Sequence, residues 1–309
     1  MGQSTAINRP DRVALGISLM LLTVFMMSYQ EALFKLYSAQ FSLWQIFSLR
    51  GVLSVPLLIL IMLALKRPGI WQQAFSFWPL LRSLSMTLMF IAMYAAIPYL
   101  SLSTVAAGIY TAPVFVTLLS ALVIGEPVGR VGWLAIIIGF AGVLVILQPA
   151  ADSFSLWALL PVLGGLLYAI SSIITRARCQ AISLPSMALS LNGVLLLTGI
   201  AFSLLIFLWQ PEAGIRESNP SLLEHWSSVD AADWQLMALL AVLAVAIGMG
   251  LAGAYQSAPP ATIAAFDYSY LVFMATWDYF FFNTAPTLTT VAGILLIVSA
   301  GLLATRRRP

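Results

Sequence analysis

The chain has 309 residues, of which 61% are hydrophobic and only 8% are charged. Soluble domains average about 45–50% apolar and about 25% charged residues, so this composition excludes a water-soluble enzyme. The one cysteine, Cys179, excludes an internal disulfide, and the one histidine, His225, excludes a histidine-rich metal site.

Long charge-free stretches predict membrane-spanning helices, because a span needs about 20 apolar residues and the chain has room for ten. No small-residue cleavage site follows the first stretch, so we expect it to be retained rather than removed as a signal peptide. The runs are continuously apolar rather than alternating, which disfavours a barrel. The predicted fold is all-α and polytopic, with ten transmembrane helices at 13–37, 42–65, 76–97, 103–124, 131–147, 154–176, 183–209, 233–255, 260–282 and 287–304.

Basic residues predict the orientation of these helices. With the N-terminus inside, the outer loops carry only Arg216, so the positive-inside rule places both termini in the cytoplasm of a bacterial inner membrane. The net charge of +3 is then a topology signal, and no nucleic-acid partner is expected. The cytoplasmic set is Arg9, Arg12, Lys66, Arg67, Arg130, Arg176, Arg178, Arg306, Arg307 and Arg308.

One long loop, 210–232, is predicted on the outer side. It contains Trp226 and four acids: Glu212, Glu217, Glu224 and Asp230. Two interpretations stay open: a solvated connector, or a segment lying along the membrane interface, where tryptophan is enriched.

The two halves of the chain resemble each other. Leu49-Arg50-Gly51-Val52-Leu53 matches Leu191-Asn192-Gly193-Val194-Leu195 at an offset of 142 residues, and later matches share an offset of 159. The pattern divides the chain into a cytoplasmic start at 1–12, repeats at 13–149 and 150–304, and a basic end at 305–309. Each repeat has an odd number of spans, so we expect the second to be inverted, as in many secondary transporters.

Residues of the first half carry a family resemblance. The segment through Arg82-Ser83, Tyr94-Ala95, Thr111-Ala112-Pro113, Gly125-Glu126-Pro127 and Gly139-Phe140-Ala141-Gly142 resembles the EamA domain of the drug/metabolite transporter superfamily. The second half has Asn283-Thr284-Ala285-Pro286 and lacks the glutamate. The resemblance implies ten helices, inverted repeats and alternating access. It is strongest to the branch with riboflavin and S-adenosylmethionine transporters, and other members export amino acids, their derivatives or metallophores.

Charged residues within predicted spans are candidates for the site, because such charges are costly and usually face a cavity or a partner. Glu31 and Lys35 lie four residues apart near the end of the first helix. They are predicted to form either a gate or an interfacial ion pair. Arg50 lies about 12 Å into its helix. Arg50 and Arg82 are predicted to bind a substrate carboxylate or phosphate, or to pair with a buried acid.

Polar and proline residues on two further helices complete the candidate site. Asp267 is predicted to bind substrate, proton or cation, or to pair with Arg82 or Arg50, and Asp278 is a gate or an interfacial anchor. Both share one helix face with Tyr270 and Trp277, which are predicted to contact substrate. On 103–124, Tyr110 is a substrate candidate, and Pro113 is a hinge or an ordinary kink.

These features predict a secondary transporter that moves a small charged or zwitterionic metabolite, such as an amino acid or its derivative, as an exporter or exchanger. Uptake of riboflavin or a S-adenosylmethionine-like solute is the alternative. The expected partners are the substrate and the lipid bilayer. Proton coupling, exchange and downhill flow all stay open as the source of energy. Glycines in helices 131–147 and 287–304 are compatible with a homodimer. No cofactor or metal is expected.

Two other classes of function are disfavoured. An intramembrane lipid-modifying enzyme needs a catalytic constellation, yet Asp267 and Asp278 lie about 16 Å apart along one helix and no second histidine exists. A scaffold without transport has no use for buried charges. No ATP-binding loop sequence is present, so ATP hydrolysis is unsupported.

Overall fold

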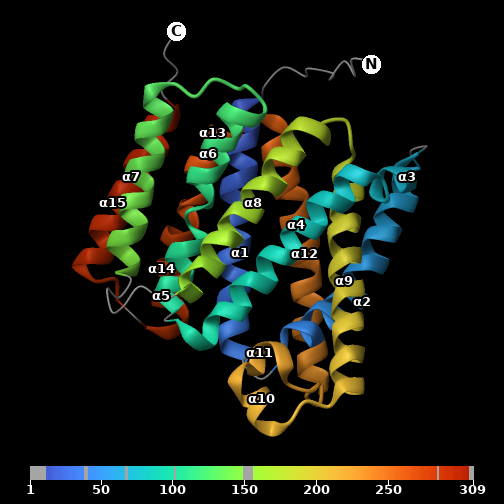
Figure 1. Cartoon of the computed structure of the whole chain (residues 1–309). Helices are drawn as coiled ribbons and strands as arrows, with labels where there is room; N and C mark the ends of the chain where they lie inside the picture. Colours follow the sequence, from blue (N-terminus) through green and yellow to red (C-terminus); the bar gives the residue numbers. More distant parts are fainter. Residues whose placement is uncertain are drawn as a thin grey trace.

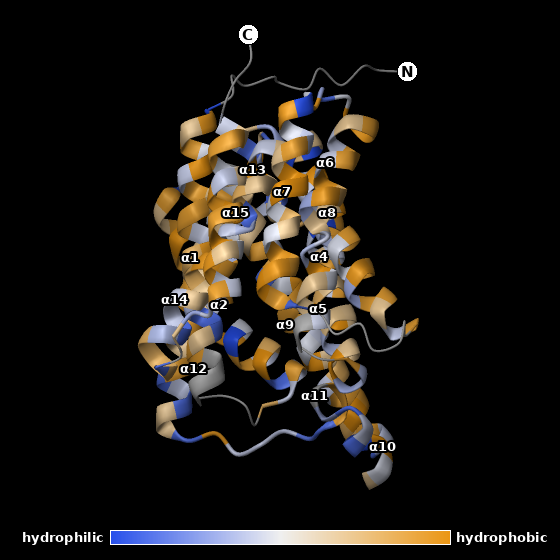
Figure 2. Ribbon diagram, turned by 90° about the vertical axis from the view of Figure 1, so that its left-hand side faces the viewer, coloured by the Kyte–Doolittle hydropathy of each residue, from blue (hydrophilic) through white to orange (hydrophobic). Residues whose placement is uncertain are grey.

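The computed structural model describes residues 12–37, 41–66, 69–100, 102–148, 156–283 and 285–305. Within these ranges every regular element is helical, which confirms the all-α prediction. Long helices form one bundle, and the short helices α10 and α11 lie together at one end of it (Figure 1). Hydrophilic residues gather toward the two ends, and the helices between are mostly hydrophobic, as in a polytopic membrane protein (Figure 2).

The helix bounds agree with the predicted spans to within a few residues. Nine segments of the described ranges are long and apolar enough to cross a membrane. The elements are α1 Val13–Tyr37, α2 Leu43–Leu65, α3 Ile70–Ala74, α4 Phe77–Ala96, η1 Ile97–Tyr99, α5 Leu102–Ile109, α6 Ala112–Val123, α7 Arg130–Leu147, η2 Leu156–Ala158, α8 Leu159–Arg178, α9 Leu184–Trp209, α10 Ala213–Ser218, α11 Pro220–Leu223, α12 Ala231–Ser257, α13 Pro260–Asp267, α14 Ser269–Phe282 and α15 Leu288–Thr305.

Two predicted spans are interrupted helices. The prediction of one continuous helix over 103–124 is wrong at Tyr110 and Thr111, where α5 ends and α6 begins. Pro113 lies at the start of α6, and a proline inside a helix has no N–H to continue the ladder. Residues 260–282 are interrupted at Tyr268 between α13 and α14. This segment is not among the nine, since its aspartates and hydroxyl groups make it more polar, and the count of ten stays a prediction.

Local capping explains where several helices begin. The Ser42 hydroxyl accepts a hydrogen bond from the Gln45 amide at the start of α2, and Ser183 does the same for α9. Asp230 and Asp233 form a capping box at the start of α12. These side chains satisfy amides that the first turn leaves without a partner, which typically contributes about 1 kcal/mol per cap.

The main helix contacts join the two halves of the chain. The most extensive contacts pair α7 with α15, α2 with α9, α4 with α8, and α1 with α12. Each pair takes one helix from before residue 148 and one from after residue 156. The largest core cluster accordingly combines side chains from both halves. The seam between the halves therefore runs through the centre of the bundle.

Glycines bring α7 and α15 into close contact. A β-carbon at Gly142 would lie 2.8 Å from the carbonyl oxygen of Gly293, and one at Gly293 would lie 2.7 Å from that of Gly142. These glycines are therefore used within the chain, and homodimerisation gains no support from them.

We expect Gly142→Ala to destabilise the bundle, because the added methyl group forces the α7 and α15 backbones apart. Overpacking of this kind typically costs about 1–3 kcal/mol. The measurement is the melting temperature in detergent. Gly193→Ala is the matched control, because a β-carbon there meets nothing within 4 Å. Equal melting temperatures for the two variants would contradict the packing account.

Candidate functional site

Arg82 is a fully buried cation at the contact between α4 and α8. Its side chain is 1% exposed, and its Nε donates to the Thr175 hydroxyl over 2.8 Å. The Nη1 atom is buried without a hydrogen-bond partner, and no acid of the described residues lies within ion-pair distance. Burying such a charge is costly unless it is paired. The structure therefore holds an uncompensated positive charge between the two halves.

A second group, which we call the Asp267 cluster, consists of Asp267, Tyr168, Tyr255 and Tyr268. Asp267 is 8% exposed and lies at the end of α13, directly before the interruption. Its carboxyl group lies beside the Tyr168 ring and within electrostatic range of Tyr255 and Tyr268. The three phenol hydroxyls are buried, and that of Tyr168 lies between the Asp267 carboxylate and Tyr255. Tyr168 is also within electrostatic range of Arg82.

A third group, the Glu31 cluster, consists of Glu31, Arg50, Tyr94 and Tyr270. The Glu31 side chain is exposed on α1, and its carboxylate accepts a hydrogen bond from the Tyr270 hydroxyl. Tyr94 lies within electrostatic range of both Glu31 and Arg50. Arg50 is half-buried, and no hydrogen bond or ion pair joins it to a described residue. An acid, a tyrosine and an arginine thus come together here, as they do around Asp267.

Tyr110 connects the two clusters. Its ring centroid lies 6.4 Å from that of Tyr268 and 5.8 Å from that of Tyr270. It stands where α5 gives way to α6, facing the interruption between α13 and α14. The clusters lie at different depths: Asp267 is about 10 Å from the start of α13, and Glu31 about 27 Å from the start of α1. Polar groups therefore extend along the axis beside two interrupted helices.

The other predicted residues lie at the edge of this arrangement. Trp277 packs against α1: its ring centroid lies 5.1 Å from that of Tyr29, and its Nε1 donates to the Ser28 hydroxyl over 3.1 Å. Asp278 is half-buried on α14, within electrostatic range of Tyr270. The Lys35 side chain lies outside the described residues, so its pairing with Glu31 stays a prediction. So do the positions of Arg9, Arg67 and Arg306–Arg308.

No ion pair joins Asp267 to Arg82 or Arg50. The described ion pairs are Arg176 with Glu126 and Arg216 with Glu224. Among the described residues, no three His, Cys, Asp or Glu side chains gather in a way that would hold a metal ion.

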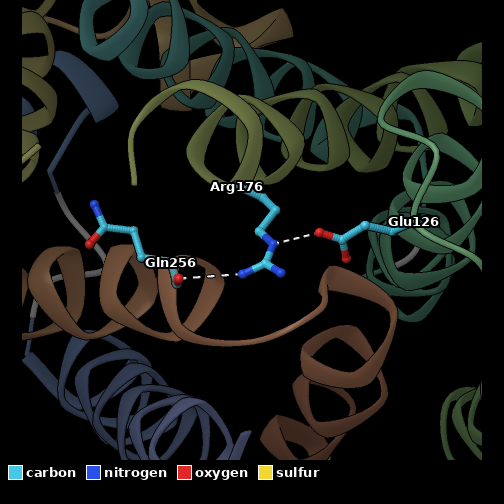
Figure 3. Close-up of polar contacts among 3 residues, drawn as sticks. All are labelled: Glu126, Arg176 and Gln256. Atoms are coloured by element: carbon cyan, nitrogen blue, oxygen red, sulfur yellow. Dashed lines mark hydrogen bonds and ion pairs between the residues drawn. The ribbon is translucent and has the colours of Figure 1, made fainter. Parts of the chain in front are cut away.

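Sequence analysis did not predict the network around Arg176 (Figure 3). Arg176, predicted as one of the basic residues on the cytoplasmic side, is 6% exposed, because its side chain turns inward from the last turn of α8. Its Nε donates to the Glu126 carboxylate over 2.7 Å, and its Nη1 lies 3.5 Å from the Gln256 carbonyl oxygen. One feature of the sequence could have indicated this ion pair: Glu126 is the lone acid in the predicted cytoplasmic loops between helices.

The network ties three elements at one end of the bundle. The Gln256 side-chain amide donates to the carbonyl oxygens of Cys179 and Ile182, over 2.7 and 3.0 Å. The segment after α6, the end of α8 and the end of α12 are thereby held together. Breaking the Arg176 contacts would free these ends to separate.

The fold and its interior charges define a class: a multi-pass helical membrane protein with charged side chains buried in its bundle. Residues 14–148 match the EamA-like transporter family. This match confirms the resemblance of the first half to the EamA domain of the drug/metabolite transporter superfamily.

Individual relatives have differing names. A riboflavin transporter of Rhizobium johnstonii is 32% identical over 198 residues, which are 64% of this chain and 60% of that protein. The pseudopaline exporter CntI of Pseudomonas aeruginosa is 25% identical over 306 residues, 96% of this chain and 98% of that one. A S-adenosylmethionine uptake transporter of Rickettsia prowazekii is 24% identical over 193 residues, 62% of this chain and 59% of that one.

A solved crystal structure shares the overall fold. The TM-score is 0.73 at 15% sequence identity, and the match covers 95% of this chain and 96% of the other. The whole bundle is therefore a known arrangement, although this likeness says nothing about the solute.

Proposed function

We propose that the protein is a secondary-active transporter that moves a small charged or zwitterionic metabolite, such as an amino acid or its derivative, as an exporter or exchanger. The observation that supports this proposal is the pair of interrupted helices with unpaired charges of both signs beside them. Interrupted helices that face each other at the seam of two repeats are typical of solute sites in transporters. Because the chain spans only 60% of the riboflavin transporter, its substrate does not follow from that likeness.

Alternating access between two inverted repeats is supported by helix order and contacts. In this proposal α1, α2 and α4 of the first repeat correspond to α8, α9 and α12 of the second. The contact of α1 with α12 and the contact of α8 with α4 are then equivalent, and both are present. The interruptions of α5–α6 and α13–α14 also correspond. The Arg12 amide donates to the Ser257 carbonyl oxygen, and Arg176 reaches Gln256, so α1 begins where α8 ends. The two helices run in opposite directions (Figure 1).

Each cluster has a proposed role. Arg50 binds a carboxylate or phosphate of the solute, since a guanidinium matches such groups with two hydrogen bonds. Asp267 binds an amine or a coupled proton, and Tyr110 and Tyr270 contact the body of the solute. Glu31, Lys35 and Asp278 form the gate at the far end, with Pro113 as the hinge of the α5–α6 interruption. Arg12, Lys66, Arg130 and Arg178 support cytoplasmic termini in an inner membrane.

The deciding experiment is flux in proteoliposomes that contain the purified full chain. The panel holds neutral amino acids, an opine-type metallophore, S-adenosylmethionine and riboflavin, with a neutral sugar as the control, at several pH gradients. We expect saturable counterflow of a zwitterionic member and none of the sugar. Flux of riboflavin or S-adenosylmethionine alone would favour the uptake alternative. No saturable flux, or a changed product, would contradict transport.

In this cycle the Arg176 network closes one end of the pathway, and Glu126→Gln is expected to loosen it. A partly exposed ion pair contributes about 1 kcal/mol, so opening should become roughly fivefold more frequent. The measurement is the rate of maleimide labelling of Ser172→Cys, a buried position on α8. Cys179→Ala is included in every protein of the series, because native Cys179 lies at the same network and would also react when this end opens.

Two further variants control this experiment. Glu217→Gln removes an exposed acid on α10 and should leave the labelling rate unchanged. The charge swap Glu126→Arg with Arg176→Glu restores the ion pair but not the hydrogen bond to the Gln256 carbonyl oxygen, so its labelling rate should lie between those of Glu126→Gln and the native chain. Slow labelling in Glu126→Gln itself would exclude the network as a closure.

A further inference from the structure

The segment 210–232 is held against the bundle at α11 and at Ser227, while most of α10 is exposed. The Trp44 indole donates to the Leu222 carbonyl oxygen over 2.6 Å. Gln45 exchanges two hydrogen bonds with the backbone of Ser227, over 2.8 and 2.9 Å. These contacts hold α10, α11 and the chain that follows over the start of α2.

This fold borders an open cavity of about 900 Å³ between the start of α2, the end of α9, α10 and residues 224–226. Its volume is in the range of small-molecule sites. Charged, aromatic and apolar side chains line it together: Glu212, Glu224, Arg216, His225, Trp44, Trp226, Leu204 and Phe207. None of these side chains belongs to the Asp267 or Glu31 cluster.

The charges around the cavity are incompletely satisfied. The Nε of Arg216 is buried without a hydrogen-bond partner among the described residues. Its Nη1 lies 3.7 Å from the Glu224 carboxylate, a loose ion pair. Glu212 brings a second acid. A ligand that offers one anion and one ammonium group would satisfy both signs.

The cavity lies at the level of a membrane interface. The neighbouring end of α9 exposes Leu204, Phe207 and Leu208, as a lipid-facing surface does. The exposed Trp226 donates its indole N–H to the Ser203 hydroxyl over 2.8 Å. Tryptophan marks the headgroup level of membranes, so an acyl chain on α9 would place its headgroup at the cavity.

We propose that this cavity binds the headgroup of a phospholipid with a primary ammonium, such as phosphatidylethanolamine. Arg216 and His225 hold the phosphate, Glu212 and Glu224 hold the ammonium, and the acyl chains follow Leu204 and Phe207. Phosphatidylglycerol brings no cation for the two acids. The methylated ammonium of phosphatidylcholine has no N–H to donate to them. The chemistry therefore selects the primary amine.

The test uses native mass spectrometry of the full chain after delipidation. Phosphatidylethanolamine, phosphatidylcholine and phosphatidylglycerol with identical acyl chains are added in equal amounts. We expect phosphatidylethanolamine to be retained at least fivefold over each of the others. Arg216→Gln and Glu224→Gln should both remove this preference. Glu217→Gln, an exposed acid of the same α10 that does not line the cavity, should keep it.

Three outcomes would overturn the proposal. The first is equal retention of the three lipids by the unaltered chain. The second is an undiminished preference in Arg216→Gln and Glu224→Gln, whose folding is checked by melting temperature. The third is displacement of the lipid by soluble glycerophosphoethanolamine at equal concentration, which would make this a site for a soluble headgroup.

Discussion

Asp267→Asn is expected to lower the transport rate per unit of substrate by roughly 30-fold to several thousand-fold. The substitution keeps the shape of the side chain but removes its charge, and breaking a buried charge pair typically costs about 2–5 kcal/mol. The measurement is the initial counterflow rate in proteoliposomes across a range of substrate concentrations and pH. If Asp267 binds the substrate ammonium, the KM rises. If it carries the coupled proton, the pH dependence of the rate flattens.

The control for Asp267→Asn is Glu217→Gln, which removes an exposed negative charge on α10, a helix that contributes no residue to either cluster, and should transport at the native rate. Tyr168→Phe adds a graded test, because it removes the hydroxyl beside Asp267 and leaves the carboxylate in place. A native rate and pH profile in a folded Asp267→Asn protein would remove Asp267 from the mechanism.

Arg50→Gln is expected to raise the KM for substrates with a carboxylate by roughly 10- to 100-fold. Hydrogen bonds to charged groups contribute about 1.5–3 kcal/mol, and the substitution removes both the charge and the fork of donors. Arg50→Lys keeps the charge but not the two parallel hydrogen bonds, so its KM should lie between those of the native chain and Arg50→Gln. The KM of each of the three proteins is measured from the saturation curve of its counterflow rate.

A neutral analogue separates a binding role of Arg50 from a structural one. The amide of the transported acid has no carboxylate for Arg50, so the native chain and Arg50→Gln should move it with similar KM. An equal loss of transport for acid and amide would assign Arg50 to the structure of the bundle instead.

Hydropathy predicted the helices well because membrane spans are bounded by charge and by proline. The predicted span 13–37 coincides with α1, and 183–209 begins one residue before α9. The interruptions were harder to predict, because the sequence on both sides of each remains largely apolar. Pro113 pointed to the first, but α14, which follows Tyr268, contains no proline.

The site was predicted in part. Charges inside spans are conspicuous because they are costly, so Arg82 and Asp267 could be selected from the sequence. Tyr168 and Tyr255 could not, since nothing in the local sequence distinguishes a tyrosine beside a carboxylate from one at the interface. Arg176 lies so near the end of α8 that its position indicates a loop, and only tertiary packing turns it toward Glu126.

The pairing of helices across the two halves bears on how the chain is made. The ribosome delivers α1 and α4 long before their partners α12 and α8. Until those partners enter the bilayer, Arg82 has no Thr175 beside it, and its charge must be sheltered by the insertion machinery or by water drawn into the membrane. Translation that stops between α7 and α8 would thus release a fragment with an exposed polar seam, a natural target for quality-control proteases.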